Sequence, residues 1–220
     1  MTALALRTAG QVNAVSELHA DVTRRMWAPI LRTAKRPVQL VFAGKAHPAD
    51  DPGKHQLQRV YQRALDSAFG GRVAFVDDYD LHVAHFLVQG CDVWLNTPRK
   101  PLEASGTSGM KAALNGVPHL SVGDGWWAEG YTGDNGWLID GGAQADDEAT
   151  DAADAEALYA LLERDVVPAF YERDSDGLPR RWLAFVRQAI RTGAPCFTTR
   201  RVVKDYVERL YAPAIRGTTP

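Results

Sequence analysis

The sequence predicts an α/β fold built on a parallel sheet, and three observations predict it. Short runs of β-branched and aromatic residues alternate with helical stretches. Each run leads into a loop rich in Gly, Asp or Pro, and the 220 residues are enough for one sizeable core. Strands that alternate with helices form parallel sheets with right-handed crossovers. Ligands bind such sheets at the carboxyl ends of the strands, so we expect the functional residues in those loops.

The expected elements follow one another regularly along the first 140 residues. An amphipathic helix is expected first, because Val12, Val15, Val22 and Met26 recur at helical spacing. Buried strands, recognised by short apolar runs, are expected at 38–43, 72–76, 92–96 and 119–122. Helices that connect these strands are expected at 55–68, 81–88 and 110–114.

The rest of the chain is expected to be helical. A small and acidic stretch at 141–148 is typical of a solvated loop. Apolar residues then recur with helical period in three segments, 154–171, 180–191 and 201–211. We expect all three helices to pack on the sheet, because each has an apolar face that needs a partner.

Composition excludes several classes of function. Lys and Arg number 25 against 27 Asp and Glu, so no basic surface for nucleic acid or an anionic membrane is expected. Cys91 and Cys196 are too far apart for a zinc motif, and the six histidines lack ligand spacing, so no metal is expected. The sequence has neither a membrane-length apolar run nor the apolar core of a signal peptide, which predicts a cytoplasmic protein.

The segment 96–111 has the features of an anion site. It follows an expected strand and runs into an expected helix, and Gly106 and Gly109 allow close approach of a ligand to the backbone. Thr107 and Ser108 can cap the helix, whose free N–H groups and dipole favour a phosphate.

Lys111 adds a reactive amine to this segment. It lies four residues after Thr107, so both side chains share one helix face and a phosphorylated aldehyde could be held covalently. Glu103, in the same loop, could accept hydrogen bonds from sugar hydroxyls. From these residues alone, a capped helix with a solvated lysine and a loop glutamate is the simpler interpretation and the favoured one.

The longer string Glu103–Gly116, EASGTSGMKAALNG, resembles the pyridoxal-phosphate segment of the glycogen and α-glucan phosphorylases over fourteen consecutive positions. Further segments that resemble this family lie on both sides, at 42–48, 75–79, 123–129 and 135–137. The last two are similar to the shorter bacterial α-glucan phosphorylases in particular. The resemblance implies a Rossmann-like domain that forms the carboxyl-terminal half of a two-domain (GT-B type) glycosyltransferase fold, with C-terminal helices.

The resemblance also implies roles for individual residues. Lys111 matches the lysine that binds pyridoxal phosphate, and the other matched cofactor contacts are Thr107, Ser108 and Tyr79. The loop expected to bind glucose hydroxyls comprises Glu103, Ala104, Ser105 and Gly106. The expected reaction is phosphorolysis of α-1,4-glucan to glucose 1-phosphate, in which the cofactor phosphate exchanges a proton with substrate phosphate. The expected partners are therefore glucan, phosphate and glucose 1-phosphate, and homo-oligomer formation is left open.

Two other functions remain open at this point. One is a retaining GT-B enzyme that uses a nucleotide sugar, with Glu103 on the sugar; such an enzyme does not need the lysine at 111. The other is a non-catalytic remnant that binds sugar or cofactor. Three further residue assignments also have a structural alternative. Tyr79 either lines the cofactor pocket or packs in the core, and Lys45 either lies in the cleft or is a solvated side chain. Trp126 and Trp127 stack on sugar or are buried, with burial favoured.

The chain departs from the family near its start. Residues 1–30 resemble the helix that ends the family's amino-terminal domain, 31–140 a partial Rossmann-like domain, and 141–220 the C-terminal helices. Between Trp27 and Pro37 the family's basic phosphate-binding segment is not found. We therefore expect a fragment with an internal deletion, reduced catalytic competence and a sheet that lacks its first strand, which would expose an edge.

Overall fold

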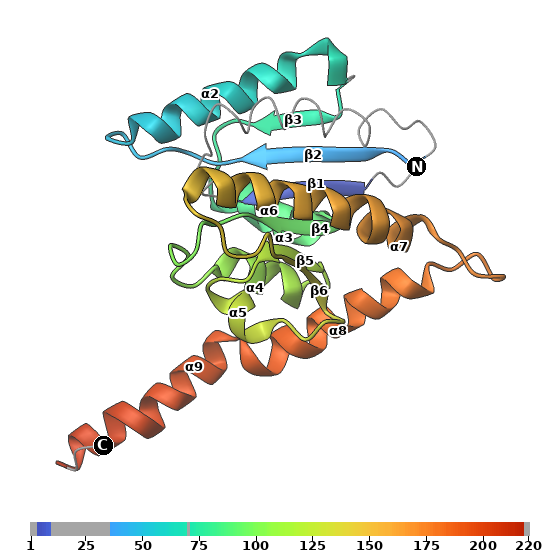
Figure 1. Cartoon of the computed structure of the whole chain (residues 1–220). Helices are drawn as coiled ribbons and strands as arrows, with labels where there is room; N and C mark the ends of the chain where they lie inside the picture. The colour runs from blue at the N-terminus through green and yellow to red at the C-terminus, as the bar shows by residue number, and fades with distance from the viewer. Residues whose placement is uncertain (1–3, 10–35, 70, 218–220) are drawn as a thin grey trace.

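The computed structural model describes residues 4–9, 36–69 and 71–217. Its centre is a six-stranded sheet in the order β3-β2-β1-β4-β5-β6, in which every neighbouring pair is parallel (Figure 1). The strands are β1 (Leu4–Ala9), β2 (Val38–Ala43), β3 (Val73–Val76), β4 (Val93–Asn96), β5 (His119–Val122) and β6 (Gly136–Ile139). The expected α/β class is confirmed.

The strand order places a topological switch point between β1 and β4. The chain winds outward from β1 through β2 to β3, then returns to β4 and winds the other way through β5 to β6. Loops diverge from each other on either side of such a point and leave a crevice at the strand carboxyl ends, where ligands bind. The loop that follows β4 is the segment singled out by its glycines, so the fold brings that segment to the crevice.

The sheet includes a strand that the sequence pattern did not predict. The expectation that the sheet begins at residue 38 without a first strand is wrong, because β1 lies between β2 and β4. Its register pairs Leu4 with Val38 and Leu6 with Val93. Six residues give little periodic signal, and the strand is defined by hydrogen bonding to two distant neighbours. The helix expected at 12–26 lies outside the described residues.

The connecting helices are close to the expected positions. They are α2 (Asp51–Leu65), the short η1 (Ser67–Phe69), α3 (Leu81–Gly90), α4 (Thr107–Leu114) and α5 (Trp126–Gly130). Asp50 explains why α2 begins before His55, since its carboxylate accepts from the Gly53 N–H and Pro occupies the first turn. Neither the short α5 nor β6 was predicted, although β6 is as long as the predicted strands β3, β4 and β5.

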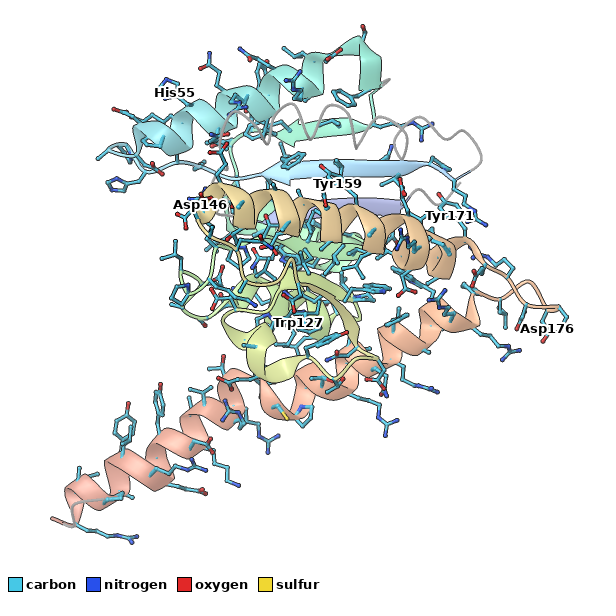
Figure 2. The ribbon with its side chains drawn as sticks, in the orientation of Figure 1. His55, Trp127, Asp146, Tyr159, Tyr171 and Asp176 are labelled. Atoms are coloured by element: carbon cyan, nitrogen blue, oxygen red, sulfur yellow. The ribbon has the colours of Figure 1, made fainter. Side chains whose placement is uncertain are left out.

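Two apolar layers cover the sheet, as the alternation of side chains along β4 shows. Val93 and Leu95 face the cluster formed with α6 (Asp147–Leu161), η2 (Leu162–Val166) and α7 (Val167–Tyr171). Trp94 faces the opposite cluster, which contains Ala112 of α4. The hydroxyl of Tyr171, labelled in Figure 2, donates to the Pro37 carbonyl at 2.6 Å and ties the end of α7 to the start of β2.

The helices after α7 differ in how they pack. Helix α8 (Arg180–Cys196) buries Trp182, Ala189 and Gly193, and it lies against α4. The continuation through α9 (Thr199–Tyr206), η3 (Val207–Tyr211) and α10 (Ala212–Ile215) buries no residue and extends away from the sheet (Figure 1). The expectation that all three C-terminal helices pack on the sheet is therefore wrong for the third, which we call the C-terminal arm (residues 199–215).

Two leucines test this difference between core and arm. Leu162 is fully buried, so Leu162→Ala should lower the free energy of unfolding by about 2–5 kcal/mol. Leu210 in the arm is 49% exposed, so Leu210→Ala should change it by less than about 0.5 kcal/mol. Urea unfolding of both variants measures the two values. Equal losses would contradict the assignment of the arm as unpacked.

Candidate functional site

The residue that precedes helix α4, at the carboxyl edge of the sheet, has an unusual backbone conformation. Gly106, which precedes the helix, has φ 75°, and it provides no side-chain cap. A Cβ at this position would lie 3.0 Å from Trp126 Cδ1, so the left-handed backbone and the close packing both favour glycine. The first N–H groups of α4 are therefore oriented toward the crevice without a side-chain cap, which suits an anion.

Lys111 and Thr107 lie on one face of α4, as their spacing predicts. The Lys111 ammonium is 3.5 Å from Thr107 Oγ1, and both side chains are exposed. The amine thus lies one turn from the helix start, on the same side as the hydroxyl. The structure brings together an amine, a hydroxyl and the positive end of a helix dipole.

Asp124, which the sequence pattern did not single out, fastens the preceding loop. One carboxylate oxygen accepts from the Glu103 N–H at 2.9 Å, and the other from the Gly125 N–H at 2.9 Å. The Trp126 N–H also donates to the Ser105 carbonyl at 2.9 Å. Residues 103–105 are therefore held against the loop after β5. A signal was present, since Asp124 follows the carboxyl end of the strand at 119–122.

The Glu103 carboxylate is oriented by the end of β4. The amide nitrogen of the buried Asn96 lies 3.4 Å from Glu103 Oε2 and donates to it. The Glu103 side chain is half-buried, while Ala104 and Ser105 are exposed. The loop expected to bind a sugar thus presents one fixed carboxylate and an exposed backbone, which are groups that accept and donate hydrogen bonds to hydroxyls.

Arg99 fixes the other end of the same loop to α6. Its guanidinium donates to Asp151 Oδ1 at 3.0 Å and to Asp147 Oδ2 at 3.2 Å. The hydrogen bond that Arg99 donates to Asp151 raises the pKa of Arg99, and burial acts against that rise. Asp151 is only 6% exposed, so the ion pair neutralises a carboxylate that would be costly to bury alone.

A buried aromatic floor lies under the start of α4. A Cβ at Gly109 would lie 2.6 Å from His119 Cε1 and 2.7 Å from Trp126 Nε1. Trp126 and Trp127 are 3% and 1% exposed, and the indole N–H of Trp127, labelled in Figure 2, donates to the Trp137 carbonyl. The interpretation of these tryptophans as packing residues is confirmed, and sugar stacking on them is excluded by their burial.

His119 is a neutral member of this floor. It is almost completely buried between Trp126 and Trp127, with ring centroids 5.2 Å and 4.8 Å away. Burial lowers its pKa from 6.5 to about 3, and the backbone of Trp94 opposes this only in part. The imidazole therefore acts as a packing side chain at neutral pH.

Tyr79 and Lys45 lie on the β2–β3 side of the site. Tyr79 is half-buried against the cluster that contains Val76 and Ala112, and burial raises its pKa. Its position beside the layer that carries α4 is compatible with a pocket wall. Lys45 is exposed, and its ammonium pairs with Asp78 at 3.0 Å.

The described parts of the chain offer neither a metal centre nor a membrane span. Residues 4–9, 36–69 and 71–217 contain no cluster of three or more His, Cys, Asp or Glu side chains arranged for a metal ion. In the same residues no helix combines the length and apolarity needed to cross a membrane.

The fold is a Rossmann-like domain of the GT-B type. Sucrose-phosphate synthase from Thermosynechococcus elongatus is similar over 97% of this chain and 46% of that chain, with a TM-score of 0.63 and 16% identity. The C-terminal domain of a group 1 glycosyl transferase from Francisella tularensis matches 89% of this chain and 86% of its own, with a TM-score of 0.57 and 14% identity. These likenesses establish the fold.

Sequence comparison then gives the family. The family model described as carbohydrate phosphorylase matches residues 29–131. Glycogen phosphorylase of Aquifex aeolicus is 51% identical over 85% of this chain, and maltodextrin phosphorylase of Thermococcus litoralis is 46% identical over 84% of it. The chain belongs to the carbohydrate phosphorylase family. It spans 27% and 22% of the length of these two relatives.

His119 predicts a specific dependence of stability on pH. The unfolded chain binds a proton near pH 6.5, whereas the folded chain does so only near pH 3. Stability is therefore lost as pH falls from 6.5 toward 3, by about 2 kcal/mol between pH 7 and pH 5. His119→Leu should remove that part of the loss. Urea unfolding at both pH values measures it, and identical pH slopes in the two proteins would contradict a buried neutral imidazole.

Gly109 predicts a destabilising effect of a single methyl group. Gly109→Ala should cost about 1–3 kcal/mol, because the new Cβ overlaps His119 and Trp126. Gly193→Ala in α8 is the matched control, since its Cβ would meet Ala113 at an ordinary 3.4 Å. That change should stabilise the protein by about 0.5–1 kcal/mol through helix propensity. Thermal unfolding compares them, and a neutral Gly109→Ala would refute the close packing.

Proposed function

We propose that this chain supplies the cofactor-binding and glucose-binding half of an α-glucan phosphorylase, which converts α-1,4-glucan and phosphate to glucose 1-phosphate. One observation carries the proposal. The Lys111 amine lies one turn inside a helix whose uncapped start is at the switch point of the sheet. A lysine in that position suits a phosphorylated aldehyde, because its amine can hold the aldehyde while the helix start holds the phosphate.

The residues present fit pyridoxal phosphate. Lys111 would hold its aldehyde carbon, and the uncapped N–H groups at Thr107 and Ser108 would hold its phosphate. Tyr79 would form a wall on the α3 side. When bound, the cofactor supplies a phosphate group that exchanges a proton with substrate phosphate. The helix dipole of α4 would favour the charged form of that group, because the positive end of the dipole is at the start of the helix.

The glucose site follows from the loop that precedes α4. Glu103, held by Asn96 and by the bond from its own N–H to Asp124, would accept hydrogen bonds from sugar hydroxyls. The exposed backbone of Ala104 and Ser105 would supply further hydrogen bonds. Because both ends of the loop are fixed, little ordering entropy is lost when the sugar binds, which favours affinity.

The names of the relatives support the choice of substrate. Glycogen phosphorylase and maltodextrin phosphorylase are the names of proteins 46–51% identical to most of this chain. The chain covers about a quarter of their length, so cofactor binding and turnover are separate parts of the proposal. A transferase that uses a nucleotide sugar has the same fold, but it gives no reason for the amine at Lys111.

Lys111 provides the test of cofactor binding. Pyridoxal phosphate at about 100 times its dissociation constant should stabilise the wild-type chain by about 2.7 kcal/mol, because only the native state binds it. Lys111→Ala should abolish both this stabilisation and the absorption band of lysine-bound pyridoxal. Lys204→Ala, in the exposed arm, is the control that should leave both unchanged.

Turnover is measured on the same proteins as release of glucose 1-phosphate from maltodextrin and phosphate. Release by the wild-type chain that is lost in Lys111→Ala would establish catalysis by this chain alone. A melting temperature unchanged by pyridoxal phosphate would contradict the cofactor site. Stabilisation by a nucleotide sugar in its place would favour the transferase.

A further inference from the structure

A second hollow lies at the carboxyl edge of the sheet, away from the Glu103 loop. It is an open groove of about 590 Å³ at the ends of β2 and β3, bounded by helix α2. Strand β1 separates β2 from β4, so the groove and the α4 site lie on different halves of the sheet. Its walls are formed by Gly44, Lys45, Ala46, Lys54, Leu57, Gln58, Tyr61, Phe75, Asp77 and Asp78.

The groove has an aromatic surface held in place. Tyr61 on α2 is 45% exposed, which is high for a tyrosine that has an apolar neighbour. Its ring meets the edge of Phe75 on β3 at 6.1 Å and 86°, a T-shaped contact that favours this orientation of the ring. A rigid, half-exposed ring offers an apolar face with a polar hydroxyl, which is the surface that an amphipathic ring such as a sugar requires.

Three of the four charged side chains that line the groove form ion pairs. Lys45 bonds to Asp78 at 3.0 Å, and Lys54 bonds to Asp51 at 2.8 Å. The two lysines and two aspartates of the lining give no net charge. A phosphate would therefore meet no excess of positive charge here. The paired groups instead present hydrogen-bond donors and acceptors, to which the Gln58 amide and the Asp77 carboxylate add, and these suit neutral hydroxyl groups.

The rim of the groove is also preorganised. Asp78 has φ 53°, an uncommon backbone conformation for a residue with a side chain, although Asp tolerates it better than most. Its ion pair with Lys45 joins the loop after β3 to the loop after β2 across the groove. A ligand would therefore meet a shape that exists before it binds, which reduces the entropy lost on binding.

We infer that this groove is a second saccharide site, which binds glucosyl units of an α-1,4-glucan through the face of Tyr61 and the polar groups of Gln58 and Asp77. The identity of the sugar rests on the proposed function. The site itself rests on the groove's own chemistry. Because the groove and the Glu103 loop share the carboxyl edge of the sheet, the groove would hold one part of a long glucan while another part reaches the crevice.

The test uses the full chain and maltoheptaose, with binding followed by amide NMR shifts and calorimetry. Tyr61→Ala should weaken binding at the groove roughly tenfold, since the variant lacks the aromatic face on which the sugar ring would pack. Gln58→Ala, a change at an exposed position, should weaken it without a risk to folding. Tyr206→Ala is the matched control, because Tyr206 is 48% exposed in the arm and should have no effect.

Three outcomes decide between the two proposals. Glu103→Gln should leave the groove shifts of Gln58 and Tyr61 intact, which separates the groove from the glucose loop. If maltoheptaose moves these signals while pyridoxal phosphate does not bind Lys111, the second saccharide site is supported and the proposed function is contradicted. The second-site proposal is overturned if maltoheptaose leaves the Gln58 signal unmoved, if neither variant weakens binding, or if inorganic phosphate moves the same signals more strongly.

Discussion

The contact between Gly109 and the buried rings of His119 and Trp126 is the constraint on which the candidate site depends. It brings the first turn of α4 closer to the layer beneath it than any side chain at position 109 would allow. The position of α4 in turn sets where its N–H groups and the Lys111 amine lie. A packing requirement in the core therefore determines the geometry of a polar site above it. The neutral state of His119 belongs to the same requirement, because a charged imidazole could not be buried there.

Charged side chains hold the loop before α4 in place, whereas close packing holds the start of α4 itself. Arg99 attaches its beginning to α6, and Asp124 attaches its end to the loop after β5. The two carboxylates in these contacts, Asp151 and Asp124, lie far from the loop in sequence. The loop is therefore defined by tertiary contacts and not by its own turn preferences. With its two ends fixed, the Glu103 carboxylate has little freedom to rearrange. A ligand would bind here to a site that is already formed.

Sequence reasoning found the elements whose signal is local. The strands at 38–43 and 119–122 are short apolar runs. The four-residue spacing of Thr107 and Lys111 predicts that both side chains lie on one face of the helix. It missed β1 and β6, whose pairing with distant strands decides their structure. It also missed Asp124, although this residue follows the end of a predicted strand, and His119, because a buried neutral histidine leaves no pattern in the sequence. The apolar face of the last helix predicted packing that the described residues do not show, because periodicity indicates a face and not its partner.

The C-terminal arm and the rest of the domain differ in local stability. Helix α8 packs against α4 and buries residues of its own. The free energy needed to open its backbone hydrogen bonds is therefore close to that needed to unfold the domain. Beyond Phe197 the helix is supported by its own hydrogen bonds and by exposed pairs such as Arg201 with Asp205 and Lys204 with Glu208. Most helical stability in proteins comes from tertiary packing, and no residue of the arm is buried. We therefore expect the arm to unfold locally at a lower free-energy cost than the domain.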